Sequence, residues 1–224
     1  MTTIIVAGVS ERTVQPEIVT IDLNLQQEGE SRENCVREVT ELHQRTVALL
    51  KERKTAGAIA EFSAGHIRSG SYQRWVSGDQ PNVLTQYARS SITITYQNFE
   101  TLAQDAVTFS ENPLVQLQNF RWDVRKESRK ALSAELRTEA VADAAERAAL
   151  YASAAGIRVD SVHQISEPGL APSNGNQPRP EMLRASADMQ MKSGSSNGDS
   201  FDVVPPELTL EASIVVEYSA SAMQ

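Results

Sequence analysis

Histidine and cysteine are the residues of this sequence best suited to metal binding or nucleophilic chemistry. The three histidines are His43, His66 and His163, and no two lie three or four residues apart, so they form no helical metal pair. His43 falls on the apolar face of a predicted helix, which favours a core or interface position over a ligand role. His66 lies near Glu61 and Arg68, but polar residues on an exposed strand explain this spacing equally well. We therefore predict no metal and no other cofactor.

The single cysteine, Cys35, is a second candidate for chemistry. It lies in the first turn of a predicted helix, near Arg32 and Arg37. A helix N-terminus and neighbouring cations lower the pKa of a thiol, so a reactive thiolate is physically possible. No base or second cysteine accompanies it, and free cysteine commonly behaves as a small apolar residue, so a passive thiol is the favoured interpretation.

The glycine pattern gives little support for phosphate chemistry. Gly65 and Gly70, with Ser71 after them, have the spacing of a phosphate-binding loop, but the lysine that this loop needs before the hydroxyl is missing. The flexible end of a strand is the favoured interpretation. The dinucleotide fingerprint G-x-G-x-x-G does not occur in the sequence either. Because no catalytic constellation stands out, we predict that the protein is not an enzyme.

A basic stretch at residues 121–130 is the candidate binding site. Its cations are Arg121, Arg125, Lys126, Arg129 and Lys130. Positive charges at the start of a helix oppose the helix dipole, so these residues could receive an anion or an acidic partner surface. Asp123 and Glu127 interleave with them, and a solvated charged face is therefore the default interpretation.

Apolar periodicity predicts the elements that position these residues. Alternation predicts strands at residues 4–9, 19–25, 88–96, 114–124, 158–165 and 208–218. A weaker strand at 58–72 is expected to form a hairpin with 88–96, across a turn at 77–81. Helical spacing predicts helices at residues 31–54, 99–110 and 128–155. Ser31 and Asn98 are the expected N-caps of the first two helices.

The order of these elements indicates the α+β class, with a mainly antiparallel sheet packed against two long helices and one short helix. In the first helix, the predicted buried stripe consists of Val36, Val39, His43, Val47 and Leu50. Residues 167–202 are rich in proline, glycine and serine and predict a long mobile loop. Its methionines Met182, Met189 and Met191 could form an adaptable apolar patch, although incidental methionines in a disordered segment are favoured.

The composition indicates a soluble globular protein that does not bind nucleic acid. Of the 224 residues, 40% are apolar and 22% are charged, as in folded chains. The 21 basic and 29 acidic residues give a net charge of -8, which argues against broad capture of nucleic acid. No apolar run approaches the ~20 residues of a transmembrane helix, and the N-terminus resembles a strand, not a signal peptide. We therefore expect a cytoplasmic protein, or an envelope or secreted one if a leader has been removed.

Four stretches of the chain carry a resemblance to a known family. The opening strand contains Gly8, and Pro16-Glu17 precedes the second strand. The strand at 87–94 and the alanine-rich helix at 130–156 follow, and Pro205-Pro206-Glu207 precedes the last strand. In order and spacing these stretches resemble the SIMPL-domain proteins, long filed as a domain of unknown function. Glu17 stands where that family usually has Asp, and Pro206 stands where it usually has Gly.

The resemblance covers nearly the whole chain and implies one α+β domain over residues 1–224 that tends to self-assemble. The family has no established general enzymatic activity, and its bacterial members are mostly exported or envelope-associated, with links to stress tolerance in some. The leading hypothesis is therefore a non-enzymatic, self-associating homo-oligomer that serves assembly or interaction with a protein partner. The alternative is a module that binds a small ligand or anion through residues 121–130.

Overall fold

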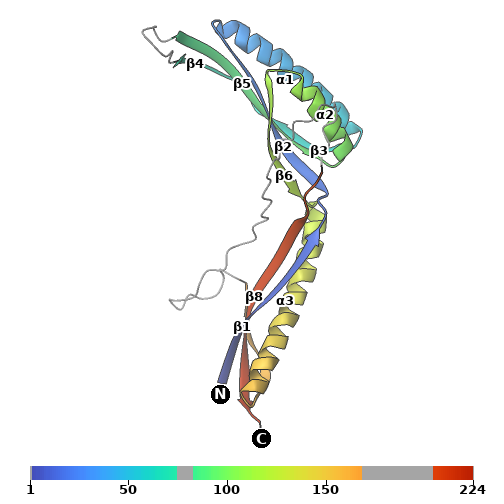
Figure 1. Ribbon diagram of the computed structural model, residues 1–224, viewed down its shortest axis with the longest axis vertical. Coiled ribbons are helices and arrows are strands. Elements are labelled where there is room, and N and C mark those ends of the chain that lie inside the picture. The colour runs from blue at the N-terminus through green and yellow to red at the C-terminus, as the bar shows by residue number, and fades with distance from the viewer. Residues whose placement is uncertain (1, 75–82, 168–203, 224) are drawn as a thin grey trace. The chain divides into compact units, whose positions relative to one another are not determined.

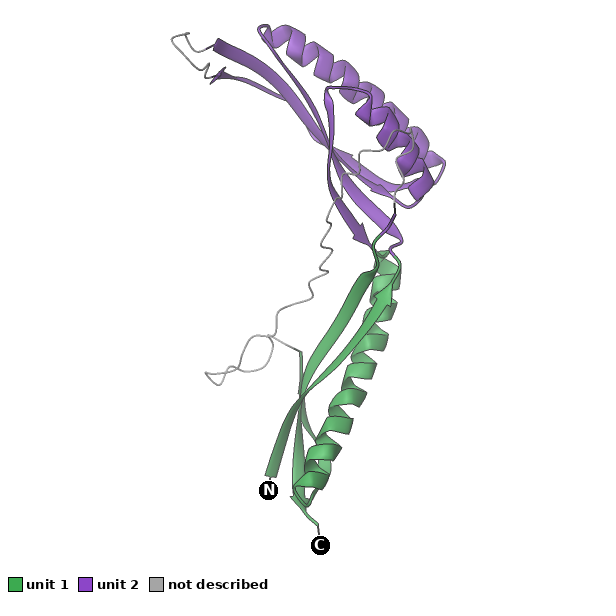
Figure 2. Ribbon diagram, in the orientation of Figure 1, with its two compact units in different colours: residues 1–15, 124–188, 206–224 green, residues 16–123, 189–205 purple. Residues whose placement is uncertain are grey.

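Long antiparallel strands and three helices make up the part of the chain that the computed structural model describes, residues 2–74, 83–167 and 204–223 (Figure 1). These residues divide into two compact units (Figure 2). Unit 1 contains residues 2–15, 124–167 and 206–223, and unit 2 contains residues 16–74, 83–123 and 204–205. The predicted α+β class is confirmed. The single domain over 1–224 stays a prediction, and it did not anticipate this division.

Unit 1 is a three-stranded antiparallel sheet with one long helix on one face. In the order β1-β8-β7, its strands are β1 (Thr2–Val14), β8 (Leu208–Ala222) and β7 (Ile157–Ser166). The helix is α3 (Lys126–Ala154), which packs against all three strands and most closely on β1. The predicted strands at both ends of the chain are therefore confirmed, and they prove to be neighbours that pair along their whole length.

Small residues let α3 lie directly on β1. The buried side chains of α3 recur every four residues and therefore share one face; they are Leu136, Ala140, Ala144, Ala148 and Ala152. Opposite them, a Cβ added to Gly8 would lie 2.0 Å from the carbonyl oxygen of Ala140 and 2.8 Å from the Cβ of Ala144. The glycine therefore sets how closely the helix approaches the strand.

Polar contacts reinforce the packing of α3 on β1. The Ser10 hydroxyl donates to the carbonyl oxygen of Leu136 at 2.6 Å, and the Val9 N–H donates to Oδ2 of Asp143 at 2.9 Å. Arg12 forms ion pairs with Glu135 and Glu139 on the same helix. One backbone donor at this edge of the sheet, the Val9 N–H, is thus already engaged by a helix side chain.

Unit 2 is a five-stranded antiparallel sheet covered by two helices. Four strands lie in the order β3-β5-β2-β6, namely β3 (Ile59–Ala64), β5 (Val83–Tyr96), β2 (Ile18–Gly29) and β6 (Val115–Asp123). β4 (Arg68–Arg74) also pairs with β5, beyond the end of β3. The helices are α1 (Arg32–Thr55) and α2 (Phe99–Ser110), and both pack on the sheet (Figure 1).

Local signals in the sequence place the strands and helix starts of unit 2 correctly. The alternating apolar residues of β2, from Val19 to Leu25, are fully buried. The Ser31 hydroxyl accepts from the Asn34 N–H at 3.3 Å, and Oδ1 of Asn98 accepts from the Thr101 N–H at 2.8 Å. Both predicted N-caps are therefore confirmed.

The buried stripe of α1 differs from the prediction. Its buried residues are Cys35, Val39, Leu42, Thr46 and Leu50. Val36, His43 and Val47 are only partly buried. The residue just before each of them is buried in its place, so the buried stripe is rotated around the helix relative to the predicted one. The two sets have nearly the same helical spacing, and the cysteine and threonine are small enough to lie against the sheet, so periodicity could not choose between them.

The predicted strand at 58–72 is two strands. The chain leaves β3 at Ala64 and resumes as β4 at Arg68, and the Gly65 N–H donates to the carbonyl oxygen of Ser91 at 2.8 Å within this break. The expected pairing with 88–96 is confirmed, since both strands pair with β5.

The turn predicted at 77–81 lies outside the described residues. So does the loop predicted at 167–202 apart from Glu167, including Met182, Met189 and Met191. Among the described residues, no helix is both long and apolar enough to span a membrane.

Candidate functional site

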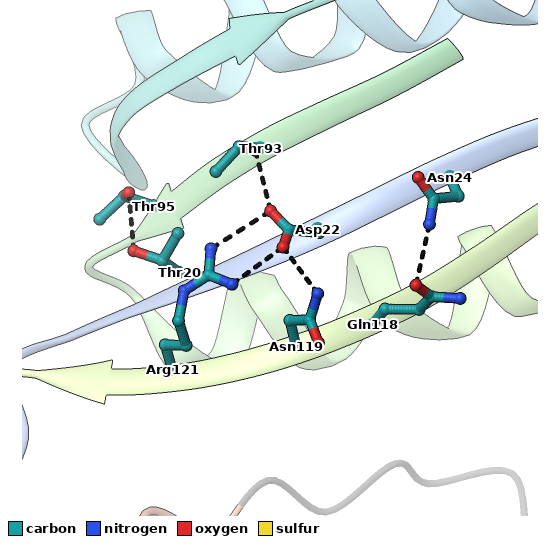
Figure 3. Close-up of polar contacts among 8 residues, drawn as sticks. All are labelled: Thr20, Asp22, Asn24, Thr93, Thr95, Gln118, Asn119 and Arg121. Atoms are coloured by element: carbon teal, nitrogen blue, oxygen red, sulfur yellow. Dashed lines mark hydrogen bonds and ion pairs between the residues drawn. The ribbon is translucent and has the colours of Figure 1, made fainter. Parts of the chain in front are cut away.

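The open face of β2, away from the helices, carries a polar cluster centred on Asp22 (Figure 3). Arg121 of β6 donates to both carboxylate oxygens, at 2.9 Å to Oδ2 and 3.2 Å to Oδ1. Asn119 donates to Oδ2 at 2.9 Å and Thr93 donates to Oδ1 at 2.8 Å. These donors, Arg121 first among them, lower the pKa of Asp22 to about 2.

A bulge in β6 brings two of these donors to one carboxylate. Thr20 pairs with Arg121 and Asp22 pairs with Gln118, so β6 has one extra residue between the two pairs. Asn119 takes a positive φ of 55° there, a conformation that asparagine tolerates better than most residues. Sequence reasoning missed this cluster, because 99 positions along the chain separate Asp22 from Arg121.

Lowering the pH from about 5 to about 2 is expected to weaken unit 2 through Asp22. Since the folded-state pKa lies below the ordinary value of 3.8, the carboxylate stays ionised when the unfolded chain is already protonated. Its stabilisation, about 1 kcal/mol after screening at the exposed guanidinium, is present above the unfolded pKa and lost as the pH falls through the folded one. Urea denaturation across this range should show a smaller loss for Asp22→Asn than for the wild type. Equal losses would contradict the assignment.

The five cations of the predicted binding stretch are not all in one unit. Arg121 belongs to unit 2, where it is bound to Asp22. Arg125, Lys126, Arg129 and Lys130 belong to unit 1, where α3 begins at Lys126, two residues earlier than predicted. The last three therefore lie in the first turns of the helix, as expected. Binding of a ligand by residues 121–130 stays a prediction.

A polar pocket of about 300 Å³ lies where β3 gives way to β4. It is lined by Asn24, Gln26, Gly65, His66, Arg68, Arg89, Ser90 and Ser91. Arg68 and Arg89 are directly opposite each other on β4 and β5, and Gln26 faces Arg89 from β2. None of these eight described residues is acidic, so the lining is positively charged.

Short-range contacts hold the basic side chains of the pocket. Nε of Arg68 donates to Nε2 of His66 at 3.0 Å, which places the proton of a neutral His66 on Nδ1. The Arg89 guanidinium lies 5.5 Å from the ring centroid of Tyr87, a cation–π distance. Sequence reasoning noted that His66 and Arg68 are close but missed Arg89, which only the strand register brings to them.

His43 supports the pocket from the helix side. Its Nδ1 lies 3.0 Å from the Ser90 hydroxyl oxygen, and that hydroxyl donates to the carbonyl oxygen of Gly65 at 3.3 Å. Which of the two atoms donates in the His43–Ser90 contact depends on the tautomer of the imidazole. Through these contacts the pair orients the wall of the pocket.

The environment of Cys35 favours the passive thiol. The side chain is buried beneath β5, and burial, with Glu38 and Glu28 nearby, raises the pKa of the thiol. The expectation that Arg32 and Arg37 could lower the pKa of this thiol was therefore wrong, because desolvation and the acidic neighbours raise it.

Among the described residues, no group of three or more His, Cys, Asp or Glu side chains could hold a metal ion. His163 lies exposed on β7.

These features define an α+β protein whose described residues form two antiparallel sheets, one packed on α3 and the other on α1 and α2, with a basic pocket on the sheet of unit 2. The chain belongs to the SIMPL family, described as a protein of unknown function (DUF541), whose profile matches residues 4–218. The family resemblance that the strands, the alanine-rich helix and the C-terminal stretch suggested is thus confirmed. No curated protein matches the chain significantly.

Proposed function

We propose that the protein is a non-enzymatic, self-associating assembly protein, and that unit 1 pairs with a second copy through β7. The observation that supports this is an open strand edge. Among the described strands β7 pairs with β8 alone, and its Val162 and Ile165 are 50% and 53% exposed. An exposed strand edge with apolar side chains is a template for pairing with another chain.

The other edge of the same sheet is less suited to this role. On β1, the outward N–H of Val9 already donates to Asp143 of α3, and Arg12 is held by two glutamates of that helix. Two copies of β7 can instead pair antiparallel about a twofold axis, so that each copy contributes the same surface and the contact closes. The expected product is a dimer with one continuous sheet.

Light scattering behind a sizing column, over a range of protein concentrations, tests this proposal. The wild type is expected at twice the monomer mass of 24.5 kDa. A variant with Val162→Lys and Ile165→Lys should be monomeric, because lysines on an edge strand block pairing. The matched control is Leu150→Lys, a 64% exposed leucine on α3, which should stay dimeric. A wild type that is monomeric at all concentrations, or a control as monomeric as the edge variant, would contradict the proposal.

The alternative function, binding of a small ligand or anion through residues 121–130, stays a prediction. Arg121 donates two hydrogen bonds to the carboxylate of Asp22. An incoming anion would have to displace this carboxylate from the guanidinium. This favours assembly as the leading proposal over a ligand site at that stretch. A role in stress tolerance remains an expectation from the family resemblance alone.

A further inference from the structure

We propose that the pocket between β2, β4 and β5 of unit 2 binds a small oxyanion, of the phosphate or carboxylate class. Its two arginines, Arg68 and Arg89, would supply the charge, and Gln26, Asn24 and Ser91 also line the pocket. The site is separate from the basic stretch at 121–130 and from the β7 edge, so it stands independently of self-association.

The first argument is the pairing of like charges. Arg68 and Arg89 are directly opposite each other in an antiparallel pair, where like charges repel and destabilise the sheet. Two other arginines of unit 2 pair with carboxylates, Arg53 with Asp105 and Arg121 with Asp22. Within the described residues, the contacts of the pocket arginines are instead to neutral groups, the ring of Tyr87 and the imidazole of His66. An anion between the two guanidiniums would relieve the repulsion.

The second argument is the supply of donors around the pocket. Nε of Arg68 is used by His66, but the terminal nitrogens of both guanidiniums carry further N–H groups suited to an oxyanion. The Ser91 hydroxyl adds a donor on the same wall. A volume of about 300 Å³ accommodates an anion of a few heavy atoms with water, at the small end of known ligand pockets.

The third argument is that the frame of the pocket is fixed before any ligand arrives. The Gly65 N–H donates to the carbonyl oxygen of Ser91, and the Ser90 hydroxyl contacts both the carbonyl oxygen of Gly65 and Nδ1 of His43. A Cβ at Gly65 would lie 3.1 Å from the Ser91 oxygen, so this strand break fits a glycine closely. A preformed site loses less ordering entropy when it binds.

Titration with inorganic phosphate and, separately, with succinate tests the proposal, using calorimetry and thermal unfolding at constant ionic strength set with sodium chloride. Saturable binding is expected with at least one probe, with the unfolding midpoint raised by about 3 °C at ten times the dissociation constant. Arg68→Gln or Arg89→Gln should each weaken binding about tenfold, and the double variant should abolish it. Both residues are surface arginines, so the variants are expected to fold.

The matched control is Arg45→Gln, which removes an exposed arginine of α1 whose partner is Glu41 on the same helix. This variant should bind as the wild type does. Binding of phosphate alone assigns the phosphate class, binding of succinate alone assigns the carboxylate class, and binding of both assigns oxyanions in general. No saturable binding of either probe, or binding that survives in the double arginine variant, would overturn the proposal.

Discussion

Replacing Gly8 by alanine is expected to destabilise unit 1 by about 3 kcal/mol, at the upper end of the usual cost of overpacking. The added Cβ would meet the carbonyl oxygen of Ala140 at 2.0 Å, and this oxygen belongs to the backbone of α3, so no side-chain rotation can relieve the contact. The helix must move off β1, which would also loosen the contacts of Ser10 and Val9 with it. Urea denaturation, followed by circular dichroism and by amide exchange of β1 and α3, measures the loss.

The neighbouring position supplies the control for Gly8. Ala7 faces away from α3 and is exposed, so Ala7→Val adds more volume to the same strand without meeting the helix. Its effect should stay within about 0.5 kcal/mol, as for other surface substitutions. Combining Gly8→Ala with Ala144→Gly should rescue little, because the Ala140 oxygen remains in the way. Full rescue by Ala144→Gly would contradict this explanation. So would equal losses of stability in Ala7→Val and Gly8→Ala, because the close approach of α3 would then not be the reason that position 8 requires glycine.

Features written in neighbouring residues could be predicted from the sequence. The alternation from Val19 to Leu25 gave a strand, and the caps Ser31 and Asn98 gave two helix starts, because each depends on contacts within a few residues. The helical spacing at residues 128–155 likewise predicted α3, which begins two residues earlier. The α+β class follows from the order of such elements and needs no knowledge of which strands pair.

Features that depend on pairing of distant residues could not be predicted. Pairing of β1 with β8 joins the two ends of the chain, and nothing local specifies the register in which Gly8 faces Ile214. The same holds for the basic pocket, since Arg68 and Arg89 meet only through the register of β4 on β5. The pKa of the Cys35 thiol is raised and not lowered, because the sheet buries the side chain. The sequence shows only the neighbours of Cys35 within its helix and therefore could not reveal this burial.

The second large effect is expected from Asp105→Ala, which should cost unit 2 about 3 to 5 kcal/mol, the range for breaking a buried ion pair from one side. Asp105 lies on α2 and is 1% exposed. Oδ1 accepts from Nε and an Nη of Arg53 on α1, at 3.1 and 2.8 Å, and Oδ2 accepts from the hydroxyl of Tyr96 on β5 at 3.1 Å. One carboxylate thus ties both helices to the sheet.

The loss should be large because the buried Tyr96 hydroxyl cannot recover its hydrogen bond in water. Tyr96 is fully buried, and burial together with Asp105 raises the pKa of its phenol, so the hydroxyl would remain neutral and without its acceptor. Arg53→Met should cost at least as much as Asp105→Ala, because it leaves the carboxylate of Asp105 buried without its cation, whereas the partly buried Arg53 can turn to solvent when Asp105 is removed.

Urea denaturation of Asp105→Ala, Arg53→Met, Tyr96→Phe and the double variant at 53 and 105 separates the three contributions. The double variant should be no less stable than Arg53→Met alone, because it also removes the buried carboxylate that this single change leaves unpaired. Glu41→Ala is the control, since its ion pair with Arg45 is exposed and spans 4.0 Å, and it should cost less than about 0.5 kcal/mol. If Asp105→Ala were as mild as this control, the carboxylate would not be what holds α1 and α2 on the sheet.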